Sequence, residues 1–173
     1  AVIVWATGPA TVAINKNFHA LGMKMPLMFT ITQSDPSFRK ATEPASDGDL
    51  MQNNKSGLLN FLPDSDPMKK VALDWRKAYQ AETGKDPTSP MAAYDPLHLL
   101  MNAIHVAGST DPDKIVNVLE TTKWVGINGT YAYSSASHAG LGLDSNVIAV
   151  IQKGELVPYK YQCDSCAKVE IPK

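Results

Sequence analysis

Short apolar runs flank one segment of helical periodicity in the first 30 residues. Residues 1–5, Ala-Val-Ile-Val-Trp, are continuously apolar and rich in β-branched side chains, which predicts a strand buried on both faces. A turn follows at residues 7–9, and a second strand is predicted at 25–30. The helical stripe between them comprises Ala10, Ile14, Phe18 and Leu21, with Gly22 as its C-cap. This order predicts a βαβ unit, and hence a parallel sheet with a right-handed crossover.

The periodicity disappears between residues 31 and 57. Turn-forming residues dominate this stretch, which predicts loops around at most one helical turn. Residues 58–62, Leu-Leu-Asn-Phe-Leu, predict a third strand. A rigid connector follows at 63–67, and it ends on Asp66 as an N-cap and Pro67 as the first helical residue.

Three helices are predicted in succession after this connector. The first covers 68–82 and ends at Gly84, the second covers about 92–107, and the third begins at 111–112. An ordinary α/β domain places strands between its helices. The succession therefore predicts helices that cover a sheet whose strands come from elsewhere in a larger protein.

After Trp124 the apolar period changes from 3.6 to 2. Strands are predicted at 129–133, 146–152 and 155–159, and Lys153-Gly154 forms a hairpin turn between the last two. Because the chain opens directly on a strand of the buried type, we expect it to be a fragment of a larger domain. We expect any targeting signal to lie upstream of this fragment.

Composition and charge narrow the class of protein. Of the 173 residues, 44% are hydrophobic and 19% are charged, a globular balance that argues against disorder. The net charge of −1 comes without a basic stripe or a basic amphipathic helix, so nucleic-acid and membrane-surface binding are not predicted. No apolar run approaches the ~18 residues of a membrane-spanning helix.

Cysteine and histidine provide the candidates for thiol or metal chemistry. Cys163 and Cys166 form a Cys-x-x-Cys pair in a polar tail, which is compatible with a local disulfide, free thiols, a redox pair or half of a zinc site. His98 and His105 are two helical turns apart, ~10 Å, which is too far for one metal ion. The four histidines show no paired zinc spacing, so we favour core or interface roles for His98 and His105 and predict no metal site.

The sequence contains no motif of a nucleophilic triad, a zinc hydrolase, a Walker phosphate-binding loop or a dinucleotide-binding loop. We therefore predict that the chain is not an enzyme and needs no cofactor.

The remaining candidates for a ligand-binding site are the loops after the first two strands. Open parallel sheets bind ligands outside the carboxyl ends of their strands. Trp5, Thr7 and Gly8 lie at the end of the first predicted strand and in its loop, and Phe29 to Thr32 lie at the end of the second. These residues offer aromatic walls, hydroxyls and helix N-terminal amides.

Several stretches together resemble the C-terminal half of a type I periplasmic solute-binding protein of the branched-chain amino acid (Liv-type) ABC transporter family. Their order and spacing, rather than any single motif, carry the resemblance, which covers residues 1 to about 160. The stretches are residues 1–9, 62–67 with 75–79, 93–97, 107–112 and 137–141.

The resemblance implies a fold of two flavodoxin/Rossmann-like α/β lobes joined by crossovers, with the ligand between them. Residues 1–62 would be the second part of the C-terminal lobe. Residues 63–125 would be helices that return to the N-terminal lobe. Residues 126–173 would contain the last crossover, short strands and the tail. Such an incomplete C-terminal fragment carries only part of the binding site.

By position in the family, the ligand-binding residues would be Thr7 and Gly8, then Thr30, Ile31 and Thr32, and finally residues 91–94 with Met91 and Tyr94. Amino-acid binders of the family place a carboxylate in the second loop to pair with the ligand ammonium. This chain has Ile31 there, and its nearest acid is Asp35. A buried ammonium without a partner is unfavourable by several kcal/mol, so the departure favours an uncharged or carboxylate ligand, including aromatic ones. His138 matches a position that we interpret as structural.

The resemblance implies the solute-binding component of an ABC importer, located in the periplasm and recognised by a membrane permease. Its solute would be a small organic molecule such as an amino acid, an amide or an aromatic carboxylate. One alternative is a ligand-sensing regulatory domain on the same fold, and the least favoured is a thiol oxidoreductase that uses Cys163 and Cys166. If the helices lack their sheet, Leu97, Met101 and Ile104 are expected to be exposed and to cause self-association.

Overall fold

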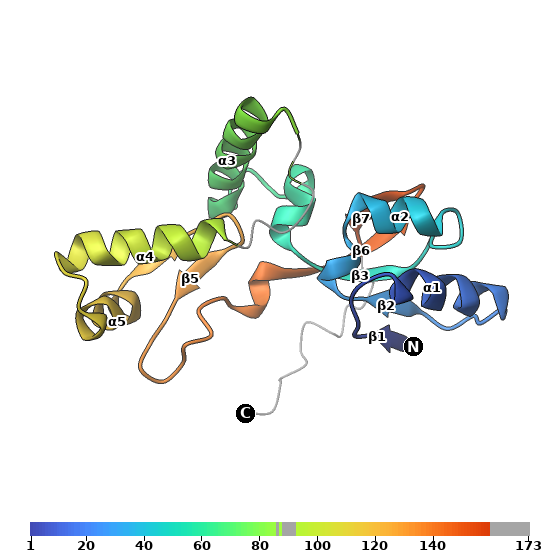
Figure 1. The fold of residues 1–173 in the computed structure, drawn as a ribbon, viewed down its shortest axis with the longest axis horizontal. Helices are drawn as coiled ribbons and strands as arrows, with labels where there is room; N and C mark the ends of the chain where they lie inside the picture. The colour runs from blue at the N-terminus through green and yellow to red at the C-terminus, as the bar shows by residue number, and fades with distance from the viewer. Residues whose placement is uncertain (86, 88–92, 160–173) are drawn as a thin grey trace.

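The computed structural model describes residues 1–85, 87 and 93–159, which form two bodies (Figure 1). We call them the sheet body and the helical body. The sheet body comprises β1 (Val2–Val4), α1 (Ala10–Ala20), β2 (Leu27–Phe29), α2 (Pro36–Thr42), β3 (Leu50–Asn54), β6 (Asn146–Gln152) and β7 (Glu155–Pro158). The helical body comprises α3 (Pro67–Thr83), α4 (Tyr94–Ala107), α5 (Pro112–Thr121), β4 (Lys123–Val125) and β5 (Thr130–Ala132). Among the helices described, none is long and apolar enough to cross a bilayer.

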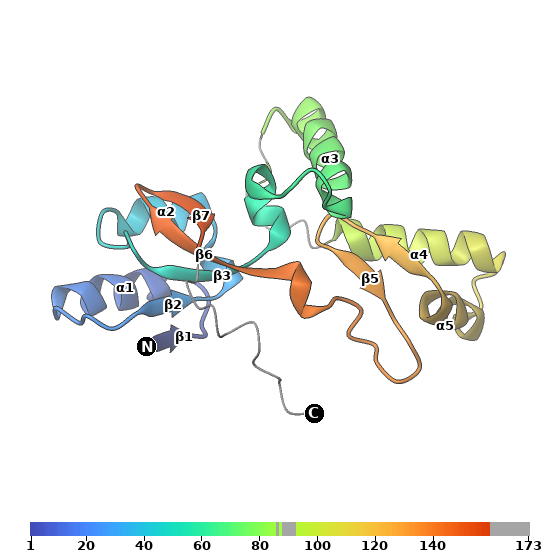
Figure 2. The same ribbon diagram turned by 180° about the vertical axis from the view of Figure 1, so that it is seen from behind.

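The chain passes between the two bodies and returns, as Figure 2 shows from behind. It leaves the sheet body through the 3₁₀ segment η2 (Lys55–Phe61) and the connector that precedes α3. It returns through the segment between β5 and β6, which contains η3 (Leu143–Ser145). The last two strands therefore complete a sheet that the first 54 residues begin.

The sheet has the strand order β1-β2-β3-β6-β7 within the described ranges. β1, β2 and β3 are parallel, which confirms the predicted parallel unit, while β6 and β7 are added antiparallel. The predicted hairpin at 153–154 is also confirmed, because β6 and β7 pair directly across it. The carboxyl ends of the three parallel strands share one edge, where the candidate ligand loops begin.

Two expectations between residues 31 and 62 are wrong. Residues 50–54 form β3 inside the stretch predicted as loop, and 58–62 belong to η2 and its C-cap rather than to a strand. The sequence of β3 lacks the alternation of apolar and polar residues that marks a strand, because its two buried positions are the apolar Met51 and the polar Asn53. The apolar run at 58–62 does not form a strand because Leu58 packs into the core of the sheet body and Leu59 into that of the helical body.

The first strand and the first helix bury different faces from those expected. Val4 is buried, but Ile3 is 58% exposed, because β1 is the edge strand and packs on one face only. On α1 the buried residues are Thr11, Asn15 and Phe18. The Nδ2 of Asn15 donates to the buried carboxylate of Asp49, and this polar contact turns the helix away from the predicted apolar stripe.

The core of the sheet body is apolar and lies between the sheet and its helices. Phe29 and Phe38 meet edge to face with ring centroids 5.1 Å apart. Leu27, Met51 and Ile151 are at most 2% exposed in the same cluster. Packing in this core anchors β2 and β3, from which the loops at the carboxyl edge start.

The helices of the helical body begin and end as the capping residues predict. The carboxylates of Asp66 and Asp111 accept hydrogen bonds from the backbone at the starts of α3 and α5. Gly84 and Gly108 end α3 and α4 in the left-handed conformation. The predicted strand at 129–133 corresponds to β5, and it pairs with β4, which the sequence did not indicate. On α4, Leu97 and Met101 are exposed, as expected, whereas Ile104 is half-buried.

Candidate functional site

The loops after β1 and β2 meet at the carboxyl edge of the sheet. The Oγ1 of Thr32 lies 3.5 Å from the backbone carbonyl oxygen of Ala6 and 2.9 Å from the Oγ1 of Thr30. Ala6 and Thr7 follow β1, whereas Thr30 and Thr32 follow β2. The structure therefore brings the backbone of the loop after β1 next to the pair of hydroxyls at the end of β2.

Gln33, which sequence reasoning missed, holds the two threonine hydroxyls in place. It belongs to the 3₁₀ turn η1 (Ile31–Gln33), and its side chain is buried. Its Oε1 accepts from the Oγ1 of Thr30 at 3.0 Å and from that of Thr32 at 2.8 Å. Thr30 is itself buried, while Thr32 is exposed. Thr32 is thus the hydroxyl of this pair that a ligand can reach.

Ile31 is anchored through its backbone rather than through its side chain. Its N–H donates to the Oε1 of Gln52 at 3.3 Å, and the Nε2 of Gln52 donates to the Oδ1 of Asn146 at 2.8 Å. These contacts connect the second loop to β3 and β6. Gln52 and Asn146 lie 94 positions apart in sequence, so no local pattern could have indicated this support.

The first loop is open to solvent. Trp5 is 83% exposed, and Thr7 and Gly8 are exposed as well. Gly8 has a φ of +81°, a conformation that favours glycine, and its carbonyl oxygen accepts from the Oγ1 of Thr11 at 2.7 Å. The turn therefore closes onto the start of α1 and leaves the Trp5 ring available as a wall.

Two of the predicted ligand-binding residues lie away from the carboxyl edge of the sheet, and a third lies outside the described residues. Phe29 is fully buried in the core of the sheet body, so its ring does not face solvent. Tyr94 opens α4 in the helical body, where its ring contacts those of Trp75 and His98 at centroid distances of 5.7 and 4.2 Å. Met91 lies outside the described residues.

The acid nearest to the second loop already has a structural role. Asp35 caps α2, and its Oδ1 accepts from the backbone N–H of Ser37 at 2.8 Å. Hydrogen bonding to Ser37 holds the pKa of Asp35 below its ordinary value. This carboxylate is committed to the helix terminus, so Ile31 stands in a loop without an available acidic partner.

A buried carboxylate connects the helical body to the returning crossover. Asp95, in the first turn of α4, is fully buried and accepts from the backbone N–H groups of Ile127 and Asn128 at 2.8 and 2.9 Å. It also accepts from the Nδ2 of Asn128 and the hydroxyl of Tyr131, both at 3.0 Å. Burial and the charge of Asp95 raise the pKa of Tyr131, which keeps this phenol a donor. A side chain on Gly126 would collide with the Asp95 carboxylate.

The same network reaches the outgoing crossover. The Oδ1 of Asn128 accepts from the Oγ of Ser56 in η2 at 2.9 Å. The segments through which the chain leaves and re-enters the sheet body are thus joined by Asp95, Asn128 and Ser56. A relative rotation of the two bodies has to act on this network.

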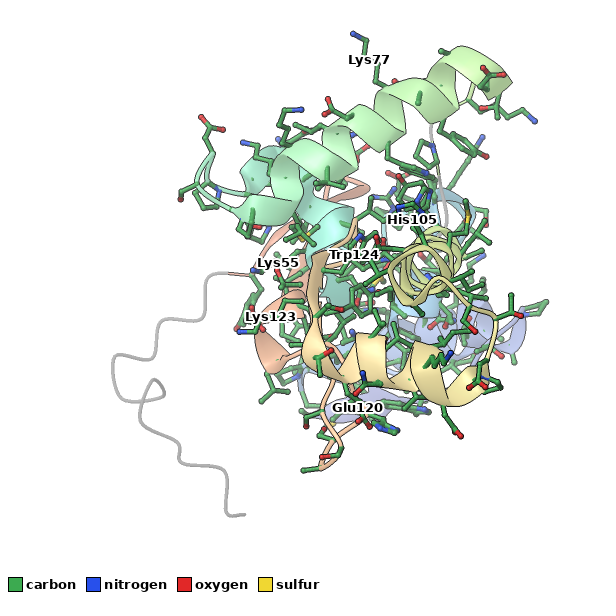
Figure 3. The ribbon with its side chains drawn as sticks, turned by 90° about the vertical axis from the view of Figure 1, so that its left-hand side faces the viewer. Lys55, Lys77, His105, Glu120, Lys123 and Trp124 are labelled. Atoms are coloured by element: carbon green, nitrogen blue, oxygen red, sulfur yellow. The ribbon has the colours of Figure 1, made fainter. Side chains whose placement is uncertain are left out.

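The other predicted chemistry residues fall in separate places. His98 lies parallel to Trp124 with ring centroids 6.5 Å apart, and His105 is exposed on α4 (Figure 3). The Nε2 of His138 lies 2.7 Å from the Oε1 of Glu120 on α5. Within residues 1–85, 87 and 93–159, no three His, Cys, Asp or Glu side chains gather as a metal site. Cys163 and Cys166 lie outside the described residues.

Comparison with known proteins identifies the family. The family model described as periplasmic binding protein matches residues 1–154. No curated protein matches the chain. An extracellular ligand-binding receptor from Rhodopseudomonas palustris HaA2 superposes with a TM-score of 0.78 at 22% identity, covering 91% of this chain and 48% of its own.

Two further solved structures agree in fold. A leucine-binding protein from Thermotoga maritima gives a TM-score of 0.69 at 21% identity, covering 91% of this chain and 43% of its own. A solute-binding protein of an R. palustris ABC transporter in complex with benzoate gives a TM-score of 0.61 at 16% identity, covering 90% of this chain and 41% of its own. The chain spans about half the length of these structures. The fold class and resemblance expected from the sequence are confirmed, and the chain belongs to the periplasmic binding protein family.

Proposed function

We propose that this chain forms one side of the solute-binding cleft of an extracytoplasmic binding protein that delivers a small organic solute to an ABC permease. The observation that carries the proposal is the meeting of the β1 and β2 loops at the carboxyl edge of the sheet, within a fold of the periplasmic binding protein family. Ligands of open α/β sheets bind at this edge. The proposed contacts are Trp5, Thr7, Gly8 and Thr32, with Thr30 and Ile31 beneath them.

The chain would supply parts of both lobes of the complete binding protein. Residues 1–62 would form the C-terminal lobe together with β6 and β7. Residues 63–125 would complete the N-terminal lobe, with Met91 and Tyr94 at the cleft. The exposed α4 residues Leu97, Leu100 and Met101 support this division, because a helix of a complete lobe buries such a face.

Capture would follow from rotation of the lobes about the crossovers. A ligand favours the closed form only through contacts that the open form lacks. Thr32 and Trp5 would supply contacts from one lobe, and Tyr94 would supply them from the other. The network of Asp95, Asn128 and Ser56 joins the crossovers and would set the free-energy difference between open and closed forms.

The loop chemistry favours a solute without a free ammonium group. Ile31 provides no carboxylate, and Asp35 is bound to the start of α2. A buried ammonium would therefore lack an anionic partner in this lobe. The exposed hydroxyl of Thr32 can accept from an amide N–H, or donate to a carboxylate that replaces Gln33 as its acceptor. The indole of Trp5 adds an aromatic wall. We expect aromatic carboxylates or amides to bind more tightly than leucine.

A thermal-shift titration of the full-length protein that contains this sequence tests the proposal. Benzoate, benzamide and leucine are the probes, and a ligand at about 100 times its Kd stabilises by about 2.7 kcal/mol. Thr32→Val should abolish most of the shift. Thr121→Val, which removes an exposed hydroxyl on α5, should not. Stabilisation by leucine alone would overturn the ligand class, and equal effects of the two variants would overturn the site.

A further inference from the structure

The side-chain amide of Gln52 joins the β2 loop to the strand through which the chain returns to the sheet body. Gln52 lies on β3, and its Oε1 accepts from the backbone N–H of Ile31 at 3.3 Å. Its Nε2 donates at 2.8 Å to the Oδ1 of Asn146, the first residue of β6. We propose that Gln52 is a positioning residue that sets the conformation of the β2 loop through a chain of hydrogen bonds ending in the returning crossover. The proposal rests on the function proposed above, because it concerns the same loop.

This chain of hydrogen bonds can run in one direction only. A backbone N–H can only donate, so the Oε1 of Gln52 faces Ile31 and its Nε2 faces Asn146. The Oδ1 of Asn146 is then turned toward Gln52, and its Nδ2 donates to the Oγ of Ser145 at 3.2 Å. The Ser145 hydroxyl in turn donates to the backbone carbonyl oxygen of Gly142 at 2.7 Å. We call the side chains of Gln52, Asn146 and Ser145 the relay; removing one of them deprives its neighbour of a partner.

At its near end the relay supplies a cap that the β2 loop lacks. Ile31 opens the 3₁₀ turn η1, and the side chain of the preceding Thr30 makes no capping hydrogen bond. The first N–H of a helical turn has no partner inside it, so the Oε1 of Gln52 takes the place of a local cap. The same short turn carries Thr32, whose hydroxyl is the proposed contact to the solute. The position of Gln52 therefore sets the position of that hydroxyl.

At its far end the relay reaches the segment that joins the two bodies. Ser145 ends η3 in the returning crossover and is 3% exposed. A Cβ added to Gly129 would lie 3.0 Å from the Cβ of Ser145, so the two residues are in close contact. Gly129 directly follows Asn128, which belongs to the hydrogen-bond network of the two crossovers. A displacement of this segment therefore acts on Ser145 and, through it, on the rest of the relay.

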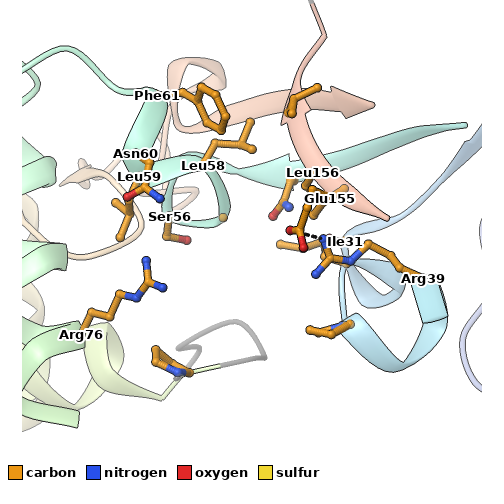
Figure 4. A pocket seen from close by; sticks show the side chains of 16 residues that line it. Ile31, Arg39, Ser56, Leu58, Leu59, Asn60, Phe61, Arg76, Glu155 and Leu156 are labelled. Carbon is orange, nitrogen blue, oxygen red and sulfur yellow. Dashed lines mark ion pairs between the residues drawn. The ribbon is translucent and has the colours of Figure 1, made fainter. Parts of the chain in front are cut away.

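Both ends of this connection border the space between the two bodies. A cavity of about 490 Å³ lies there, between Arg39 of α2 and Arg76 of α3 (Figure 4). Ile31, where the relay begins, and Ser56, which donates to the crossover network, both line it. A rotation of one body against the other acts on both residues. The relay ties that rotation to the conformation of the β2 loop.

Hydrogen-exchange mass spectrometry of the full-length protein that contains this sequence tests the relay without a ligand. Gln52→Met keeps the length of the side chain but removes the acceptor, so exchange in a peptide spanning residues 30–34 should become about threefold faster or more. Asn146→Ala should speed exchange of the same peptide, whereas Asn146→Asp should not, because its carboxylate still accepts from Gln52. Gln152→Met, at an exposed position of β6, is the matched control and should leave the exchange unchanged.

A double variant distinguishes a relay from two independent supports of the loop. If Asn146 acts on the loop through Gln52, adding Asn146→Ala to Gln52→Met should cause no further increase in exchange. Titration with benzoate extends the test to the solute. Gln52→Met should weaken benzoate binding about threefold or more, and Asn146→Ala should weaken it only while Gln52 is present.

Three exchange results would overturn the proposal: an unchanged rate at residues 30–34 in Gln52→Met, additive effects in the double variant, or equal effects of Asn146→Ala and Gln152→Met. Benzoate affinity that stays constant while exchange rises would overturn it as well. A loss of affinity in Gln52→Met but not in Asn146→Ala would mean that Gln52 touches the solute directly, which also contradicts the relay. If benzoate fails to bind the unsubstituted protein, the proposed solute class is wrong, and the exchange measurements still decide the relay.

Discussion

The sheet body and the helical body are stabilised by different kinds of contact. Among the described residues, the core of the sheet body contains nine buried hydrophobic residues, including Phe29, Phe38 and Met51. The main cluster of the helical body contains four, including Met68 and Ile127, and three more buried hydrophobic residues, Leu99, Ala103 and Val118, lie on α4 and α5. The helical body depends more on the buried carboxylate of Asp95 and its four hydrogen bonds. Both bodies leave apolar side chains exposed, and the helical body concentrates them on α4.

This difference indicates where the chain needs another partner. The strands of the sheet body expose Ile3 on β1 and Ile148 on β6, and these two strands are not neighbours in the sheet. Leu97, Leu100 and Met101 instead lie in solvent on α4, at 57, 46 and 56% exposure. Such a contiguous apolar face is typical of an interaction surface. Substitutions can test this contrast between a larger apolar core and a small core that a polar network supports.

The largest expected effect comes from Asp95→Asn. The substitution leaves buried N–H and O–H donors facing an amide that cannot accept from all of them. Breaking one side of such a buried charged network destabilises a protein by about 3–5 kcal/mol. Urea denaturation followed by tryptophan fluorescence measures the change. Asp74→Asn, at an exposed site paired with Lys70, should cost less than about 0.5 kcal/mol. Comparable effects of the two variants would show that the Asp95 network does not hold the helical body.

Met51→Ala should have the next largest effect. Met51 is fully buried at the centre of the sheet-body core, and removing such a side chain costs about 2–5 kcal/mol. Met101→Ala is the matched control on α4, and its 56% exposure predicts a change within about 0.5 kcal/mol. Both values come from the same denaturation assay. A large loss in the Met101 variant would mean that α4 packs against something in solution.

Self-association provides a smaller but more direct test of the α4 face. The isolated chain should associate at micromolar concentration through Leu97 and Met101. The double substitution of both residues by Ser should weaken association at least about tenfold, equivalent to about 1.4 kcal/mol. Sedimentation velocity over a concentration series measures this. A compact monomer before any substitution would contradict the expectation.

The smallest expected effect concerns pH and the polar contact beneath α1. Burial raises the pKa of Asp49 above its ordinary 3.8, because desolvation outweighs its hydrogen bonds to His19 and Asn15. The native state therefore binds this proton more tightly than the unfolded chain does. Its contribution to the free energy of unfolding is present below 3.8 and is lost as the pH rises through the raised pKa. Asp49→Asn should flatten this slope in acid denaturation curves, and an unchanged slope would contradict the assignment.

Local signals predicted α1, α3, α4 and α5 well, but not α2, which lies in the stretch expected to be loops. The Asp-Pro starts at 66–67 and 111–112 and the glycines at 84 and 108 act within a few residues, so their effect can be read directly from the sequence. The parallel β1-α1-β2 unit was predictable for the same reason. The third parallel strand was not, because Asn53 takes a buried place in β3 that an apolar residue would have marked.

The residues of the candidate site also divide into those that the sequence could indicate and those that only the structure shows. Thr30 and Thr32 could be chosen from the sequence, because ligand loops follow strand ends. Gln33 could not be assigned its role, since only the fold turns its amide toward both hydroxyls. The cavity between Arg39 and Arg76 was invisible to sequence reasoning as well. Its walls come from segments that lie far apart along the chain.

The sequence by itself determined the helices, their caps, the parallel unit and the family resemblance, because these depend on short-range spacing and on the order of motifs. Only the tertiary structure decided which polar groups are buried and what satisfies them. Asp95 and the backbone N–H groups of residues 127 and 128 that donate to it are more than 30 positions apart. Leu58 and Leu59 enter different cores although they are adjacent. Burial and hydrogen bonding depend on three-dimensional neighbours, which local periodicity does not specify.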